Sequence, residues 1–130
     1  MLILTLRTDK PESEIAIFDD TKLLAQEKWQ AHRQLAETIH HKLKQLLSAQ
    51  GRTLSDVEAI VVFSGPGSYT GLRIGISVAN ALAAGLNIPI IGSNHEAWQE
   101  TGMEKLANGR NDQQVLPEYG APAFTTLPKK

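Results

Sequence analysis

The chain has 130 residues, a formal net charge of −1 and no cysteine. Its length suits one compact domain with a tail, and its balanced charge argues against a protein that binds nucleic acid by itself. The lack of cysteine excludes disulfides and thiolate metal sites and is compatible with the cytosol. Charged residues from Arg7 onward end the apolar start too early for a signal peptide or membrane span. We therefore expect a cytoplasmic protein.

The first part of the chain predicts three strands. Residues 2–6 form a buried apolar run, residues 14–18 alternate as a second strand, and a third strand passes through Leu23 and Leu24. The turns at residues 8–12 and 19–21 are short and polar, so the strands should form an antiparallel meander.

Two predicted helices flank a fourth strand. Residues 33–50 predict a helix with one apolar face. Residues 59–63 are continuously apolar and β-branched, which is typical of a strand buried on both faces. A glycine-rich turn at residues 64–68 leads into a second helix, which ends near residue 85.

The final elements are shorter. Residues 88–91 predict a strand parallel to the fourth, and Pro89 places it at or near a sheet edge. Residues 94–106 predict a short helix. We divide the chain into a lobe of residues 1–106 and a proline-containing tail of residues 107–130 without its own core. The tail should cover the sheet edge near residues 88–91 or bind a partner.

The order β-β-β-α-β-α-β predicts an α/β domain with a mixed five-stranded sheet flanked by helices. This order is similar to a ribonuclease-H-like lobe, the half-unit of actin-like (ASKHA) proteins. The analogy concerns fold and gives no function by itself.

Two helical stripes suggest contacts between helices. In the first helix, Leu35, Ile39 and Leu43 share one apolar face. The second helix repeats a small residue at every fourth position, which allows close approach of another backbone. These small residues are Gly71, Gly75, Ala79 and Ala83. We expect the stripe of small residues to pack against a helix of another chain. Of Leu35, Ile39 and Leu43, some should lie in the core and others in the interface. Gly75→Leu should then abolish pairing and leave the monomer folded.

The glycine-rich turn is a candidate anion site, because N–H groups at a helix N-terminus attract anions. The residues of such a site would be Gly65, Gly67, Ser68, Thr70 and Arg7. The spacing matches neither a Walker loop nor the dinucleotide fingerprint, so a purely structural turn is the alternative. Arg7 ends the first strand and should lie near the turn, where it would pair with an acidic side chain, bind an anion or stay solvated.

Other catalytic patterns are weak. Ser68 lacks the Gly-x-Ser-x-Gly spacing of a hydrolase nucleophile. His40 and His41 are helical neighbours that project about 100° apart, so they do not suit one metal ion. We expect no catalytic residue and no metal site.

Residues 64–75, SGPGSYTGLRIG, closely resemble the signature of the TsaB (YeaZ) family. The resemblance extends to residues 54–60 and 85–92 and covers about residues 2–98. It implies a non-catalytic subunit that pairs with the transferase TsaD to form threonylcarbamoyladenosine on tRNA beside the anticodon. TsaE would join as a further partner, tRNA would bind through the complex, and metal and nucleotide would sit on TsaD.

The resemblance also implies an interface on the helices of the lobe. Its residues would be Leu35, Ile39, Leu43, Gly71, Arg73, Gly75, Ala79 and Ala83. Whether the isolated chain self-pairs is left open by the sequence, and any self-dimer would use the same face.

Two departures from the family pattern bear on function. The family's first strand usually ends in Asp-Thr, and that carboxylate organises metal-nucleotide in active relatives. Here the residues are Arg7 and Thr8. Family members also carry a second lobe after the equivalent of Trp98, so we expect a one-lobed version. The alternative is a glycoprotease-like or sugar-kinase-like ATP-binding enzyme acting alone. Direct tRNA binding is disfavoured by the charge and the few aromatics.

Overall fold

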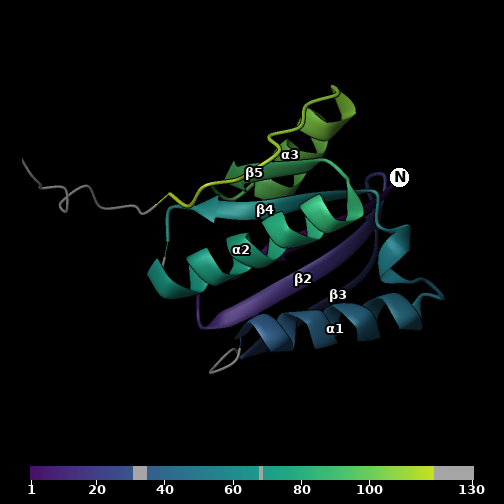
Figure 1. Ribbon diagram of the computed structural model, residues 1–130, viewed down its shortest axis with the longest axis horizontal. Helices are drawn as coiled ribbons and strands as arrows, with labels where there is room; N and C mark the ends of the chain where they lie inside the picture. Colours follow the sequence, from purple (N-terminus) through teal and green to yellow (C-terminus); the bar gives the residue numbers. More distant parts are fainter. Residues whose placement is uncertain (31–34, 68, 119–130) are drawn as a thin grey trace, which may run out of the picture.

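A computed structural model describes residues 1–30, 35–67 and 69–118 of the chain. Figure 1 shows a sheet with helices on both sides. The elements in chain order are β1 (Leu2–Arg7), β2 (Glu12–Asp19), β3 (Lys22–Gln30), α1 (Leu35–Ala49), a short 3-10 helix (Leu54–Asp56), β4 (Ala59–Gly65), α2 (Tyr69–Leu86), β5 (Ile90–Asn94) and α3 (Trp98–Ala107).

The five strands form one mixed sheet in the order β3-β2-β1-β4-β5. β1, β2 and β3 pair antiparallel, which confirms the predicted meander. β4 pairs parallel with both β1 and β5, as the strand–helix–strand pattern predicts. β5 lies at the edge, where Pro89 placed it, because proline has no N–H to donate to a further strand.

Side chains alternate between the two faces of the sheet, and this alternation assigns each helix to a face. Gln99 of α3 donates a 2.9 Å hydrogen bond to the Thr5 hydroxyl, and a Cβ at Gly102 would overlap Val61, so α3 packs on the face that carries these two side chains. α1 and α2 lie together on the other side (Figure 1). The core is therefore built from both faces of β1 and β4, whose apolar side chains are almost fully buried.

Two elements begin later in the structure than the sequence predicts. The last helix begins at Trp98 rather than at residue 94, because His95 has a φ of +69° and cannot continue a right-handed helix. The last strand begins at Ile90, two residues later than expected. In the described ranges, none of the helices is long and apolar enough to span a bilayer.

The described part of the tail, residues 108–118, has no helix or strand and runs along the free edge of β5. The Asp112 N–H donates to the Ile90 carbonyl at 2.8 Å, and the Asp112 carboxylate accepts from the Gly92 N–H at 2.9 Å. Val115 is 5% exposed, and both its N–H and its carbonyl bond the Asn80 side chain at 2.9 Å. The expectation that the tail covers this edge is confirmed for these residues.

Candidate functional site

The candidate site lies where β1 and β4 end side by side. Leu6 pairs with Val62 in the parallel register, so Arg7 emerges beside Phe63, just before the glycine-rich turn. The Arg7 guanidinium carbon lies 3.9 Å from the centre of the Phe63 ring, a cation–π contact. Sheet pairing alone thus brings Arg7 to the turn, as expected from strands that end on the same edge.

Arg7 has an acidic partner. Its Nε donates to one carboxylate oxygen of Asp9 at 2.6 Å, and its terminal nitrogen donates to the other at 3.2 Å. The side chains of Arg7 and Asp9 are 18% and 6% exposed, so this bidentate pair is largely removed from water. Of the three alternatives for Arg7, the structure therefore shows pairing with a carboxylate.

Asp9 also lies against the turn itself. A Cβ built on Gly67 would stand 2.6 Å from the Asp9 Cβ and 3.1 Å from one of its carboxylate oxygens. Glycine is needed here because Asp9 occupies the space that a side chain would take. A second anion placed at this turn would face the Asp9 carboxylate at short range, which is repulsive in a site of low dielectric. Anion binding by this turn thus stays a prediction. The Asp9 carboxylate would oppose it, because it already lies beside the turn.

The small stripe of α2 packs against the segment that follows β1. The Thr8 hydroxyl donates a 2.7 Å hydrogen bond to the Gly71 carbonyl oxygen, and a Cβ at Gly71 would lie 2.5 Å from the Thr8 carbonyl oxygen. A Cβ at Gly75 would overlap the Thr8 hydroxyl. The expectation that this stripe contacts another chain therefore needs correction, since its close neighbour is Thr8 of the same chain.

The other residues assigned to the partner interface are mostly internal. Five of them are at most 6% exposed and belong to the chain's own core: Leu35, Ile39, Leu43, Ala79 and Ala83. Arg73 is exposed on α2, as are the small residues Ser77 and Ala81. The exposed side of α2 is thus the one that carries Arg73, Ser77 and Ala81, whereas Gly71 and Gly75 pack on Thr8.

Sequence reasoning missed Thr8 and Asp9. The available signal was positional: both residues directly follow a strand whose end lies beside the glycine turn. Ser68, proposed for the anion site, and His32 lie outside the described residues, while Thr70 is exposed. His40, His41 and His95 are exposed, and the described ranges contain no cluster of acidic or histidine side chains suited to a metal ion.

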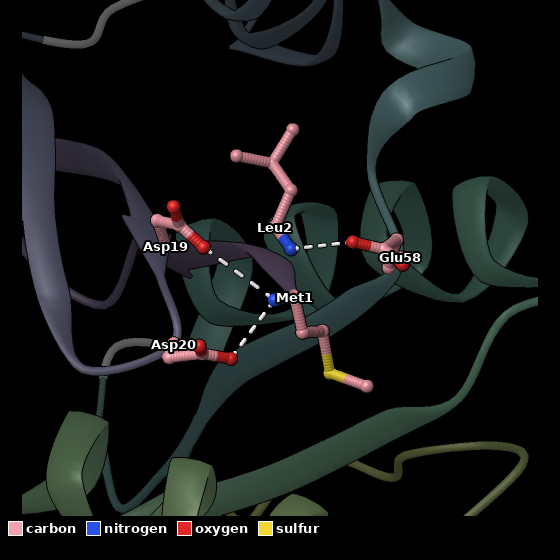
Figure 2. A network of polar contacts seen from close by, with 5 residues as sticks. All are labelled: Met1, Leu2, Asp19, Asp20 and Glu58. Atoms are coloured by element: carbon pink, nitrogen blue, oxygen red, sulfur yellow. Dashed lines mark hydrogen bonds and ion pairs between the residues drawn. The ribbon is translucent and has the colours of Figure 1, made fainter.

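A second polar cluster lies at the opposite end of β1 (Figure 2). The Met1 ammonium group donates to Asp20 at 2.8 Å and to Asp19 at 3.5 Å, and the Leu2 N–H donates to Glu58 at 2.8 Å. The hydrogen bond to Asp20 raises the pKa of the Met1 ammonium group above its ordinary value of 8.0, with a smaller contribution from Asp19. These contacts tie the chain start to the β2–β3 turn and to the residue before β4, and they are structural.

Known proteins share this architecture. RuvC of Thermus thermophilus, 14% identical, superposes with a TM-score of 0.52 over 95% of this chain and 86% of its own, a likeness of fold alone. The sheet order and the helix arrangement thus define a ribonuclease-H-like lobe.

The sequence comparisons are more specific. Residues 29–110 match the family described as TsaD, tRNA N6-adenosine threonylcarbamoyltransferase. The Escherichia coli protein named tRNA threonylcarbamoyladenosine biosynthesis protein TsaB is 30% identical over 82% of this chain and 48% of its own length. YeaZ from Pseudomonas aeruginosa is 29% identical, with a TM-score of 0.66 over 78% of this chain and 50% of its own. The chain belongs to the TsaD-related family and, within it, to the TsaB (YeaZ) group. It spans about half the length of these TsaB and YeaZ relatives.

Proposed function

We propose that this chain acts in the biosynthesis of threonylcarbamoyladenosine on tRNA, as a non-catalytic subunit that pairs with the transferase TsaD. The observation that carries the proposal is the match of residues 29–110 to the TsaD family, together with the TsaB likeness over 82% of the chain. TsaE would be a further partner, tRNA would bind through the complex, and the assembly would work in the cytoplasm.

The geometry at the end of β1 supports the non-catalytic part of the proposal. Arg7 stands where the family usually has the carboxylate that organises metal-nucleotide, and its guanidinium is held in place by Asp9 and Phe63. A fixed cation at this position would repel Mg²⁺, which prefers carboxylate and phosphate oxygens. We therefore assign metal and nucleotide chemistry to TsaD.

The partner surface follows from which side of α2 is exposed to solvent. Ser77 and Ala81 are small, exposed and on the side of α2 that turns away from the sheet, with Arg73 one turn before Ser77. Small side chains allow a partner helix to approach closely. When the chain is alone, a second copy would use the same face.

The proposal is tested by calorimetric titration of the purified chain with TsaD from its own organism, and by tRNA modification assays with and without the chain. We expect a one-to-one complex and modification that depends on both proteins. Ala81→Arg should weaken binding at least tenfold, because a long charged side chain would enter the contact. The matched control is Ala97→Arg, an exposed alanine beside α3, on the other side of the sheet.

Two results would overturn the proposal. One is modification of tRNA by TsaD at an unchanged rate when this chain is omitted. The other is micromolar affinity of the isolated chain for Mg-ATP with hydrolysis, which would favour an enzyme that acts alone.

A further inference from the structure

A groove lies between α3 and the β2–β3 turn, on the side of the sheet away from α1 and α2. It consists of two adjoining cavities of about 260 and 250 Å³, which share Thr21, Met103 and Ala107 in their walls. None of these residues takes part in the site at the glycine turn. The groove is open to solvent in the described part of the chain.

The floor of the groove is apolar. Ile3, Phe18, Met103 and Leu106 line it and are each at most 8% exposed, because they also belong to the core. Next to it, Leu23 pairs with Phe18 across the β2–β3 hairpin and is 45% exposed, a high value for a large apolar side chain. Such a continuous apolar surface favours an occupant with apolar side chains.

The rim of the groove is acidic. Glu100 and Glu104 line the first cavity and are exposed, and the described residues give neither of them an ion pair. Asp20 lines the second cavity and already binds the Met1 ammonium group. The groove therefore suits a short extended segment that carries both apolar and positively charged side chains.

We propose that the C-terminal residues 124–130 of this same chain occupy the groove. Their sequence is Phe-Thr-Thr-Leu-Pro-Lys-Lys, which places two apolar side chains, Phe124 and Leu127, ahead of two lysines. The lysines complement Glu100 and Glu104, and Pro128 favours an extended backbone. The segment thus matches the groove in two respects: it carries apolar side chains, and its charge is opposite to that of the rim.

The chain length permits this contact. The tail is held as far as Glu118, whose N–H donates to the Ser64 carbonyl oxygen at 2.7 Å, at the carboxyl end of β4. Trp98 at the start of α3 packs edge-on against Phe63 at that same end, with ring centres 5.8 Å apart. The groove runs along α3 from Gln99 to Ala107, and its far end lies about 15 Å from Trp98 for a ten-residue helix. The nine residues from Glu118 to Leu127 span about 30 Å when extended, which leaves room to pass around the sheet.

Because the segment is part of the same chain as the groove, weak contacts are sufficient for it to bind there. A segment linked to its site by a short chain has an effective concentration in the millimolar range. Docking would also cover apolar surface on the sheet face that neither α1 nor α2 reaches, and so reduce self-association.

The test uses the full chain, which has no cysteine of its own. One variant combines Thr21→Cys with Leu127→Cys, and the matched control combines Ser48→Cys with Leu127→Cys. Thr21 lines the groove, whereas Ser48 is exposed on α1, on the opposite side of the sheet. Under mild oxidation we expect an intramolecular disulfide to form at least tenfold faster in the Thr21 pair than in the control.

A second variant tests the charge contact. Adding Glu100→Gln and Glu104→Gln to the Thr21 pair should slow disulfide formation at least threefold at low ionic strength, and added salt should remove that difference. Equal rates in the Thr21 and Ser48 pairs would overturn the proposal. Cross-linking that gives mainly dimers and rises with protein concentration would also overturn it, and would assign the groove to a second copy. No TsaD is present, so the outcome is independent of the function proposed above.

Discussion

The hydroxyl of Thr8 donates a 2.7 Å hydrogen bond to the carbonyl oxygen of Gly71, and this contact joins the end of β1 to the first turn of α2. The small residues of α2 allow that approach, since Gly75 leaves the space that the Thr8 side chain fills. The closest packing of the family signature is thus made within the lobe, and four consequences of the structure can be measured.

Gly75→Ala should destabilise the monomer by about 1–3 kcal/mol, because the new Cβ would overlap the Thr8 hydroxyl. The measurement is thermal or urea unfolding. Gly85→Ala is the matched control: Gly85 is in the same helix with nothing within 4 Å of its Cβ position, so this change should stabilise by up to about 1 kcal/mol. Equal effects of the two substitutions would show that α2 does not pack on Thr8.

Arg7→Ala should cost about 3 kcal/mol of unfolding free energy, because it leaves the buried Asp9 carboxylate without its cation. Arg110→Ala is the control. Arg110 also pairs with an aspartate two residues later, at 3.1 Å, but its side chain is 56% exposed. Exposed pairs contribute about 0–1 kcal/mol, so the control should be nearly neutral. An Arg7→Ala protein as stable as the control would contradict the assigned role of the pair.

The Met1 ammonium group should make stability depend on pH in the alkaline range. Its pKa is raised in the folded protein, chiefly by the hydrogen bond to Asp20. The stabilisation is therefore fully present below pH 8.0, the ordinary pKa, and is lost as the pH rises through the higher folded-state pKa.

Urea unfolding of the parent protein and of Asp20→Asn, followed from pH 7 to pH 10, checks this dependence. Asparagine also tolerates the positive φ of 56° at residue 20, so the comparison isolates the charge. The stability difference should shrink as the pH rises, and Asp19→Asn should have a smaller effect, since Asp19 contributes less to the raised pKa. A difference that stays constant with pH would refute the contribution of the ammonium group.

Truncation after Leu106 should lower the melting temperature and promote aggregation, because it uncovers the edge of β5. A chain that ends at Glu118 keeps the bonds of Asp112 and Val115 and is the control. Asn80→Ala tests one contact alone: it removes both bonds to the Val115 backbone and should cost about 1–3 kcal/mol. Light scattering and thermal unfolding report the outcome. Aggregation of both truncated chains to the same extent would show that residues 108–118 do not protect the edge.

The sequence by itself determined which elements form and in what order. The apolar run of residues 59–63 and the stripe through Leu35, Ile39 and Leu43 are local patterns, and the structure places both in the core. Pro89 likewise placed the last strand at the edge, because the missing N–H is a property of the residue and needs no knowledge of its neighbours.

Tertiary structure alone decided which residues meet. Arg7 and Asp9 are two residues apart, yet Asp9 reaches Gly67 only because β1 pairs parallel with β4 and both end at the same edge. Thr8 meets Gly71 and Gly75 for the same reason, which the four-residue period of α2 could not show. A four-residue repeat of small residues shows only that one side of the helix carries small side chains. The register of the sheet decides which residues fill the space beside that side.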